Sequence, residues 1–472
     1  MLTHLALSLA LAAAPAQEAA PVDHYARGVE ALRARDAAAA AQALSACTAE
    51  QPERVECHWE LGWAHWLAGD WAKVVAAWEQ VEKLDPTHAE LAEKLAEARA
   101  QLALRERLAA AKEAPVEAVH RPAPEGAALR LRAVGDVMIG TDFPAGYLPP
   151  EDGAVVLRAV RELLADADLT FANLEGPLCD RGETTKCRKG GNCYAFRSPT
   201  RYGRYLKEAG VDLVGVANNH VGDFGAVCRA DTEATLDELG IKWSGPPGTV
   251  ASLERNGLKV AMIAFHASTA TNDLNDIETA KALVREASSA HDLVIVSFHG
   301  GAEGPKALHV PHGPETFYGE NRGDLRRFTH EVVDAGADLV VGHGPHVVRA
   351  IEIYKDRLIA YSLGNFATYG RFNLRGPNGL GFILDVTLDA EGRFLAGKAI
   401  ATRQIDKGIA VPDPDGAVLG LLRKLSAEDF PDTGVTVAED GRLDRRTPTM
   451  VATPASAEKQ AKPASVKPQE AP

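Results

Sequence analysis

Short apolar runs alternate with helical patterns along most of the chain beyond residue 128. The apolar runs are typical of strands buried on both faces, and they fall at residues 131–134, 169–172, 213–216, 260–265, 293–298, 339–341 and 358–360. The segments between them have apolar positions at helical spacing, at residues 155–166, 201–209, 229–239, 277–290 and 324–335. Because strands that alternate with helices build sheets covered by helices, the pattern predicts a fold of the α/β (or α+β) class.

The pattern changes towards the C-terminus. Residues 381–388 and 394–405 alternate with period two around a turn, which predicts a hairpin that closes the domain. We therefore assign residues 129–405 to the main domain and residues 406–446, where the pattern weakens, to a C-terminal extension. The tail at 447–472 is rich in Pro, Ala, Lys, Ser and Gln and is predicted to be disordered.

An alanine-rich helical region precedes the main domain at residues 24–112, and a linker with three prolines follows it at 113–128. Residues 55–88 resemble a tetratricopeptide repeat (TPR), whose successive signature positions are matched by Trp59, Leu61-Gly62, Gly69-Asp70, Trp78 and Pro86. A degenerate copy at 24–54 precedes this repeat, and a capping helix at 89–112 follows it. Since stacked repeats need neighbours, we expect this TPR-like region to pack on another domain or to bind a protein partner. A generic helical hairpin is the alternative.

The first sixteen residues have the pattern of a secretory signal peptide. Residues 5–11 form an apolar core, and Ala14-Pro15-Ala16 matches the small residues that precede a cleavage site. We therefore expect residues 1–16 to be removed and the protein to be exported, to the periplasm or the cell surface. Because the stretch before the apolar core has no Lys or Arg, a retained anchor is the alternative. No other segment is long and apolar enough to predict a transmembrane helix.

Six cysteines in an exported chain favour disulfides over free thiols. Cys47 and Cys57 are expected to form one pair. A second group, whose pairing the sequence leaves open, contains Cys179, Cys187, Cys193 and Cys228. Zinc binding by this group is the alternative, and the lack of a close Cys-x-x-Cys pair weighs against it.

The charge balance narrows the choice of partners. The chain carries 51 Lys and Arg against 65 Asp and Glu, a formal net charge of −14. Because binding to nucleic acid requires clustered basic residues that neutralise phosphates, this balance argues against a nucleic-acid partner. An anionic polymer would have to bind through a metal or a local basic patch.

Side chains that can bind metals recur where the predicted strands end. They are Asp136, Asn173, Glu175, Asn218, Asn219, His220, Asp223, His299, Glu303, His343 and His346. Because the carboxyl ends of strands in an α/β sheet form a crevice, we expect these side chains to lie close together. Carboxylates, a carboxamide and imidazoles form a ligand set for zinc, manganese or iron rather than calcium. The sequence therefore predicts a transition-metal site.

Each of these residues also has a purely structural interpretation. Asp136 after a strand is compatible with the cap of a helix or turn, and Asn173 with an Asx turn. His343 and His346 are alternatively structural histidines. Arg322 fits either a contact to an anion or an ordinary salt bridge. Histidines without such a context are interpreted as surface or core residues, namely His266, His291, His309, His312 and His330.

In their order and spacing these motifs resemble the CapA family of capsule-synthesis (poly-γ-glutamate capsule) proteins, within the calcineurin-like metallophosphoesterase superfamily. The resemblance covers residues 129–405 and rests on Gly135-Asp136, Asn173-Leu174-Glu175, Asn219-His220 with Asp223, His299 with Glu303, Gly-His-x-Pro-His at 342–346 and Ser-Leu-Gly-Asn-Phe at 362–366. It implies a four-layer sandwich, in which helices lie outside two facing sheets and the site lies at the strand ends.

The resemblance also implies roles for individual residues. The implied metal ligands are Asp136, Asn219, His299, His343, His346 and, as the bridging carboxylate, Glu175. His220 would donate a proton to the leaving group, and Asp223 would orient it. The implied cofactor is one or two divalent ions of Mn, Zn or Fe, since two cations about 3.5–4 Å apart lower the pKa of a water between them.

Two departures from the superfamily pattern bear on the number of metals. Met138 stands where superfamily members usually have a histidine, and the closing motif is Gly-His-x-x-His instead of Gly-His-x-His. One metal position is therefore expected to be weak or lost, unless Glu303 or another carboxylate compensates.

We interpret the chain as an exported, metal-dependent hydrolase that acts in the synthesis or processing of a capsule or cell-envelope polymer similar to poly-γ-glutamate. The alternative is a non-catalytic polymer-binding or assembly factor, with a residual metal site and a TPR-like module that binds a partner. Because fold alone does not determine function, the two interpretations stand side by side at this stage.

Overall fold

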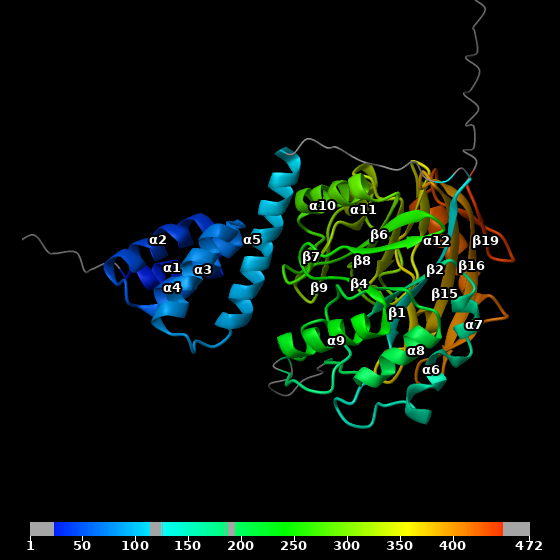
Figure 1. Ribbon diagram of the computed structural model, residues 1–472, viewed down its shortest axis with the longest axis horizontal. Helices are drawn as coiled ribbons and strands as arrows, with labels where there is room; N and C mark the ends of the chain where they lie inside the picture. The colour runs from blue at the N-terminus through cyan, green and yellow to red at the C-terminus, as the bar shows by residue number, and fades with distance from the viewer. Residues whose placement is uncertain (1–22, 114–123, 125, 185, 187–193, 447–472) are drawn as a thin grey trace, which may run out of the picture. The chain divides into compact units, whose positions relative to one another are not determined.

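The computed structural model describes residues 23–113, 124, 126–184, 186 and 194–446 (Figure 1). Outside the described residues lie the predicted signal peptide at 1–16, most of the predicted linker, the tail at 447–472, Cys187 and Cys193. The described chain forms two compact units, a helical unit that ends with Glu113 and a larger unit that contains most residues from Pro124 onward.

The described part of the helical unit consists of α1 (His24–Arg33), α2 (Ala37–Glu50), α3 (Val55–Ala68), α4 (Trp71–Leu84) and α5 (Leu91–Glu113). α1, α2 and α4 begin after Asp23, Asp36 and Asp70, because each of these side chains accepts a hydrogen bond from a backbone N–H in the first helical turn. α1 packs against α2 and α3 against α4, so the predicted repeat at 55–88 forms the second of two helical hairpins.

Tryptophans form the core of this unit. Trp78 is fully buried, and its Nε1 donates a hydrogen bond to the carbonyl oxygen of Trp59 at 3.1 Å. A Cβ atom on Gly62 would lie 2.0 Å from Trp78 Nε1, so glycine is required where α3 and α4 approach each other here. A disulfide between Cys47 and Cys57 joins α2 to α3, as predicted. The TPR-like pattern thus corresponds to paired helices around an aromatic core.

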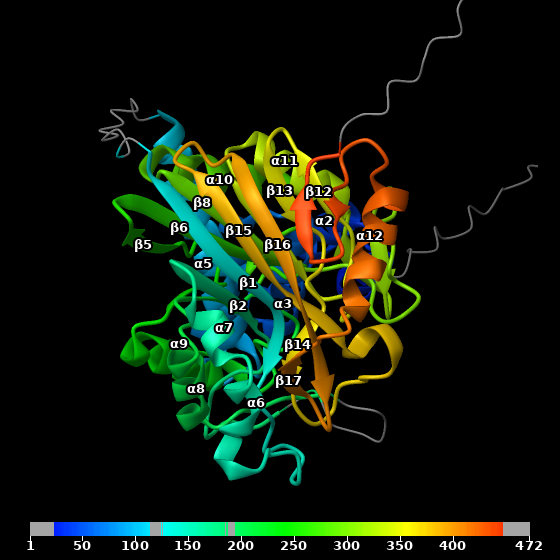
Figure 2. The same cartoon turned by 90° about the vertical axis from the view of Figure 1, so that its right-hand side faces the viewer.

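Two main sheets form the larger unit (Figures 1 and 2). The described strands of the first are β1 (Ala128–Met138), β2 (Leu169–Leu174), β3 (Leu213–Gly215), β4 (Lys242–Ser244), β14 (Asn365–Thr368), β15 (Leu380–Asp389), β16 (Phe394–Ile405), β17 (Ile409–Pro412), β18 (Thr436–Val437) and β19 (Arg442–Asp444). They lie in the order β18-β19-β16-β15-β1-β2-β3-β4, with β14 beside β1 and β17 beside β16.

The second sheet contains β5 (Ala251–Arg255), β6 (Leu258–His266), β7 (Asn272–Asp273), β8 (Leu293–His299), β11 (Leu339–His343), β12 (Ile351–Tyr354) and β13 (Arg357–Ala360). These strands lie in the order β12-β13-β11-β8-β6-β5, with β7 beside β6. A separate small hairpin consists of β9 (Glu315–Phe317) and β10 (Glu320–Gly323).

The two sheets face each other, because side chains from both belong to one buried cluster: Leu131 and Phe171 from the first sheet, with Met262, Ile295 and Val341 from the second. The outer face of the first sheet is covered by α6 (Val155–Arg158), α7 (Arg161–Ala165), α8 (Gly203–Glu208) and α9 (Gly225–Leu239). The outer face of the second sheet is covered by α10 (Ile277–Ala290) and α11 (Leu325–Asp334). The predicted four-layer α/β sandwich is therefore confirmed.

The predicted closing hairpin is present as β15 and β16. Other elements differ from the prediction. The helix predicted at 155–166 is divided into α6 and α7 by a turn. Residues 406–446 add β17, β18 and β19 to the first sheet and also form α12 (Ala417–Asp429). The described 3₁₀ helices are η1 (Glu151–Gly153), η2 (Thr200–Tyr202) and η3 (Gly376–Gly379). Of the described helices, none combines the length and the apolar composition that crossing a membrane requires.

Parallel pairing places the polar residues at one end of both sheets. In the first sheet, β1, β2 and β3 are parallel, and Asp136 lies opposite Asn173. In the second, β6, β8 and β11 are parallel, and three histidines lie in register at their carboxyl ends: His266, His299 and His343. Because polar residues end strands in both sheets, the candidate site is built where the two sets of carboxyl ends meet.

Candidate metal centre

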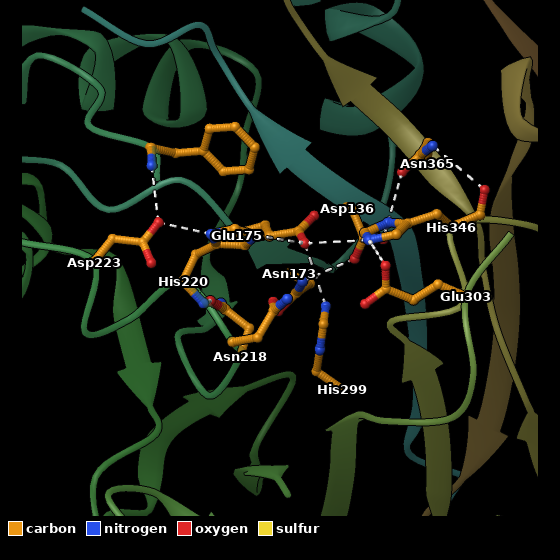
Figure 3. A network of polar contacts seen from close by, with 12 residues as sticks. Asp136, Asn173, Glu175, Asn218, His220, Asp223, His299, Glu303, His346 and Asn365 are labelled. Carbon is orange, nitrogen blue, oxygen red and sulfur yellow. Dashed lines mark hydrogen bonds and ion pairs between the residues drawn. The ribbon is translucent and has the colours of Figure 1, made fainter. Parts of the chain in front are cut away.

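Asp136 is held at the end of β1 by contacts on both of its carboxylate oxygens. Oδ1 accepts a hydrogen bond from Asn173 Nδ2 at 2.8 Å, and Oδ2 lies 3.0 Å from His346 Nδ1 (Figure 3). The backbone of Gly364 also packs tightly against the residue before Asp136. A Cβ atom on Gly135 would lie 1.8 Å from the carbonyl oxygen of Gly364. The glycine of the Gly-Asp motif is therefore a packing requirement that fixes the aspartate in place.

Glu175 follows β2 directly and is fully buried, yet neither carboxylate oxygen has a hydrogen-bond partner among the described residues. Three imidazoles surround Oε1, with the Nε2 atoms of His299, His346 and His220 at 3.4, 3.6 and 3.8 Å. Burial raises the pKa of Glu175 well above its usual value, an effect that the charge of His346 opposes and that of Asp136 reinforces. A buried carboxylate without a donor is unfavourable unless a cation compensates it.

His299 and Asn219 contribute further buried atoms without partners. Neither ring nitrogen of His299, at the end of β8, has a hydrogen-bond partner among the described residues, and the same holds for Asn219 Oδ1. Burial lowers the pKa of His299 well below its usual value, so the ring is neutral at neutral pH. Neutral imidazole is the form that binds metals.

His346 lies in the loop after β11 with a φ angle of +57°. Its Nδ1 lies 3.0 Å from both Asp136 Oδ2 and Asn365 Oδ1, so Nδ1 carries the proton that these two acceptors share. Nε2 faces Glu175. Burial disfavours the charged ring, but the carboxylates of Glu175 and Asp136 outweigh it and raise the pKa of His346 to about 10. Metal binding at Nε2 would displace a proton and take over its charge.

His220 and Asp223 form a buried pair beside Glu175. Asp223 Oδ2 accepts hydrogen bonds from His220 Nδ1 at 2.7 Å and from the backbone N–H of Phe196 at 2.8 Å (Figure 3). Lys186 Nζ lies 2.7 Å from the other oxygen. Burial lowers the pKa of His220, although Asp223 acts in the opposite direction. With Nδ1 bonded to Asp223, Nε2 is the atom directed into the site.

His343 has different surroundings. It is fully buried, with Nε2 at 3.1 Å from the carbonyl oxygen of Val134 and Nδ1 at 3.3 Å from that of Phe298. Since β1 carries Val134 and β8 carries Phe298, the ring links the two sheets. Its role as a metal ligand stays a prediction.

Three of the predicted ligands meet most closely. One atom each from Asp136, Glu175 and His346 lies within 4.8 Å of the other two, a separation that a shared cation can span. His299 Nε2 lies 3.4 Å from Glu175 Oε1, and Asn219 Oδ1, next to His220 in the chain, is a buried atom with no partner among the described residues. The donor set is oxygen and imidazole, which suits Mn, Fe or Zn, so the residues present fit a transition metal.

Sequence reasoning missed two residues that support this site. Asn365 Oδ1 orients the His346 ring, and its Nδ2 donates to the His346 carbonyl oxygen at 3.3 Å. His266 Nδ1 lies 2.7 Å from the carbonyl oxygen of His299, and burial lowers the pKa of His266 to about 4. Both had a signal: Asn365 belongs to the Ser-Leu-Gly-Asn-Phe motif, and His266 ends an apolar run, as His299 does.

Comparison with known proteins links this arrangement to a family. The family model for the bacterial capsule synthesis protein PGA_cap matches residues 130–369, more than half of the chain. Capsule biosynthesis protein CapA of Bacillus anthracis is 28% identical over 277 residues, which cover 54% of this chain and 62% of that protein. PGA biosynthesis protein CapA of Bacillus subtilis is 26% identical over 251 residues, which cover 49% and 61%. The chain thus matches about three fifths of the length of these curated relatives.

Among solved structures, NAD nucleotidase (NadN) of Haemophilus influenzae aligns with 64% of this chain and 56% of its own, at a TM-score of 0.32 and 11% identity. That likeness is too weak to indicate a shared function. The family match, in contrast, spans the strands that carry Asp136, Glu175, His299 and His346. The resemblance drawn from the motifs is confirmed: this chain belongs to the bacterial capsule synthesis protein PGA_cap (CapA) family.

Proposed function

We propose that this protein is an exported, metal-dependent hydrolase that acts in the synthesis or processing of a capsule or cell-envelope polymer of the poly-γ-glutamate kind. One observation carries the proposal. Buried donor atoms of Glu175, His299 and Asn219 have no hydrogen-bond partner among the described residues. Because buried polar atoms are almost always paired, these unpaired atoms support a bound cation.

The residues that would hold the metal come from both sheets. Asp136, Glu175 and His346 would form one position, and Glu175, Asn219 and His299 would form the other, with Glu175 shared. A divalent cation there would supply Lewis acidity and lower the pKa of a water molecule. We keep Mn, Zn and Fe as the candidate ions, in one or two positions.

His220 would supply the proton to the leaving group. Asp223 accepts a hydrogen bond from Nδ1, so Nε2 faces the space beside Glu175 and would deliver a proton there from the protonated ring, the form that Asp223 favours. The backbone N–H of Phe196 and Lys186 Nζ occupy the remaining acceptor positions of Asp223, which fixes the carboxylate and therefore the ring. The burial of His220 keeps bulk water from competing for this proton.

The substrate class rests on the relatives and on charge. Both relatives are named for capsule or PGA biosynthesis. With a net charge of −14, the chain would attract an anionic polymer only at a metal or a local basic patch. The signal-peptide pattern at 1–16 and the disulfides Cys47–Cys57 and Cys179–Cys228 support export to the periplasm or cell surface.

A second candidate function is a non-catalytic polymer-binding or assembly factor that has a residual metal site. Met138, in place of a histidine ligand, favours it, because thioether sulfur is a poor ligand for a hard cation. The TPR-like region at 24–112 would then recruit a protein partner.

Elemental analysis of the purified full chain, followed by a turnover screen, tests the proposal. We expect stoichiometric transition metal in the wild type, a loss of metal in Asp136→Ala, and hydrolysis of a phosphoester or a γ-glutamyl polymer. His220→Ala should abolish turnover and keep the metal. Metal without turnover would favour the assembly factor, and the absence of metal in the wild type would contradict the proposed site.

A further inference from the structure

Near Asp136, the chain has the non-polar residue Met138 where superfamily members usually have a histidine ligand. Asp136 and Met138 lie two residues apart near the end of β1. Met138 is fully buried and packs against Gly176, where a Cβ atom would lie 2.5 Å from Met138 Cγ. Because this side chain offers only a thioether, a cation at this position needs a donor from elsewhere.

Glu303, in the loop after β8, brings a carboxylate to the Nε2 side of the His346 ring. Its Oε2 lies 3.9 Å from His346 Nε2, the nitrogen that Glu175 approaches to 3.6 Å. Since His346 Nδ1 is bonded to Asp136 and Asn365, Nε2 is the ring atom left for a cation. Figure 3 shows the carboxylates of Glu175 and Glu303 both directed at this ring.

The backbone on both sides of Glu303 is anchored. The carbonyl oxygen of Ala302 accepts a hydrogen bond at 3.2 Å from Nη2 of Arg349, a fully buried residue. On the other side, the N–H of Gly304 donates to the carbonyl oxygen of Pro345 at 2.8 Å, which ties the loop to the segment that carries His346. This anchoring limits the positions that the Glu303 carboxylate can take, as expected for a ligand held ready for its ion.

Arg322 fixes one oxygen of Glu303 and leaves the other directed at His346. Arg322 Nη2 lies 3.3 Å from Glu303 Oε1, and the Arg322 side chain is only 6% exposed. Arg322 Nε also lies 3.2 Å from Glu320, whose side chain is 68% exposed and faces solvent instead of the site. The salt bridge alternative for Arg322 is thus what the structure shows, and it orients Glu303.

We propose that Glu303 is a direct ligand of the metal that Glu175 and Nε2 of His346 would hold, in place of the histidine that Met138 replaces, with Arg322 as its positioning residue. A carboxylate in this role adds a hard oxygen donor to the set and, compared with a histidine there, shifts the preference of the site towards Mn²⁺. The inference rests on the proposed function only in requiring that this site binds a metal.

Metal titration of the full chain tests this proposal. Four proteins are compared: the wild type, Glu303→Gln, Glu303→His and Glu320→Gln. Circular dichroism first shows that each is folded. Each is then stripped of metal and titrated with Mn²⁺ and, separately, with Zn²⁺. Loss of a ligand should weaken Mn²⁺ binding by about tenfold or more in Glu303→Gln. Glu303→His should regain tight Zn²⁺ binding, since imidazole suits Zn²⁺. The matched control Glu320→Gln removes the other carboxylate on Arg322 and should bind Mn²⁺ as the wild type does.

The outcomes separate this inference from the proposed function. Wild-type Mn²⁺ binding in Glu303→Gln would overturn the ligand role and leave the metal site standing. Zn²⁺ binding in Glu303→His no tighter than in Glu303→Gln would also overturn it, because a residue that only orients His346 cannot be replaced by another donor. A wild type that binds neither ion would remove the proposed function and this inference together.

Discussion

At the scale of single residues, Gly62 tests the packing of the helical unit. In a helix interior, alanine is ordinarily more favourable than glycine by about 1 kcal/mol. Here a Cβ atom would lie 2.0 Å from Trp78 Nε1, so we expect Gly62→Ala to destabilise the unit by about 1–3 kcal/mol, the usual cost of overpacking. Urea unfolding followed by tryptophan fluorescence measures this, since five of the six tryptophans belong to the unit.

The matched control for this substitution is Gly420→Ala in α12. Nothing lies within 4 Å of the Cβ atom that alanine would add there, so the same change should be neutral or stabilising by up to about 1 kcal/mol. Equal effects at the two glycines would contradict the explanation from the contact with Trp78.

Asn365 tests how the ring of His346 is oriented. Asn365→Ala removes the acceptor that lies 3.0 Å from Nδ1, so the ring loses one of the two contacts that direct Nε2 towards Glu175. Loss of a residue that orients a ligand typically lowers metal affinity by about 10–100-fold, and we expect this range in a Mn²⁺ titration. Asn373→Ala, an exposed change in the same region, should have no effect. A folded Asn365→Ala with wild-type affinity would exclude this role.

The sequence identified single site residues better than their contacts. Asp136 lies two residues before the end of a buried strand, His299 ends one and Glu175 directly follows one, so position along the chain was enough to propose them. The contact between Asn365 and His346 depends on the start of β14 and the loop after β11, which meet only in the folded chain. His343 shows the same limit, because its motif does not reveal that both of its ring nitrogens face carbonyl oxygens.

At the scale of elements, Asp338 joins three strands of the second sheet and gives this junction a pH dependence. It precedes β11, accepts a hydrogen bond from the N–H of Val294 on β8 at 2.9 Å, and contacts Arg357 on β13. Burial raises the pKa of Asp338 to about 6, although both partners act in the opposite direction. The folded state therefore prefers the protonated acid, and its contribution to stability is present below pH 4 and lost as pH rises through 6.

We compare the free energy of unfolding of the wild type with that of Asp338→Asn. The wild-type value minus the variant value should fall by up to about 3 kcal/mol between pH 4 and pH 6.5 and stay level above that. Urea unfolding at a series of pH values, followed by circular dichroism, measures the difference. Asp389→Asn provides a control of opposite sign. Burial acts against the charge of Asp389, but hydrogen bonds from Arg393 outweigh it and lower its pKa, so its contribution is lost as pH falls. A difference at Asp338 that rises with pH would contradict the assignment.

Elements were predictable where the apolar pattern was long enough. The apolar runs that predicted β6 and β8 each contain six consecutive residues, and nearly all residues of these two strands are buried. β18 has two residues and β19 has three, too few to show a period. β19 takes its place by pairing with β16, and β18 by pairing with β19. The local pattern also could not predict the order of the strands in the sheet. β14 and β15, for example, pair with successive parts of one edge of β1, although β1 lies far from both in the sequence.

At the scale of the whole molecule, the candidate metal centre joins two sheets that also share an apolar core and the His343 ring. Asp136 and Glu175 come from the first sheet, and His299 and His346 come from the second. Without a cation, two buried carboxylates are compensated mainly by one charged imidazole. A metal there would therefore stabilise the larger unit as a whole, whereas the helical unit has its own aromatic core.

Removing the metal should therefore lower the stability of one unit only. At a free concentration of 100 to 1,000 times its dissociation constant, a ligand stabilises the folded state by about 3–4 kcal/mol. Chelation with EDTA should lower the melting temperature of the larger unit by several degrees in calorimetry and leave the tryptophan-detected transition of the helical unit unchanged. Mn²⁺ should restore the transition and Ca²⁺ should not, because imidazole ligands suit transition metals. Equal shifts of both transitions, or none in a chain shown to contain metal, would contradict a centre that joins the two sheets.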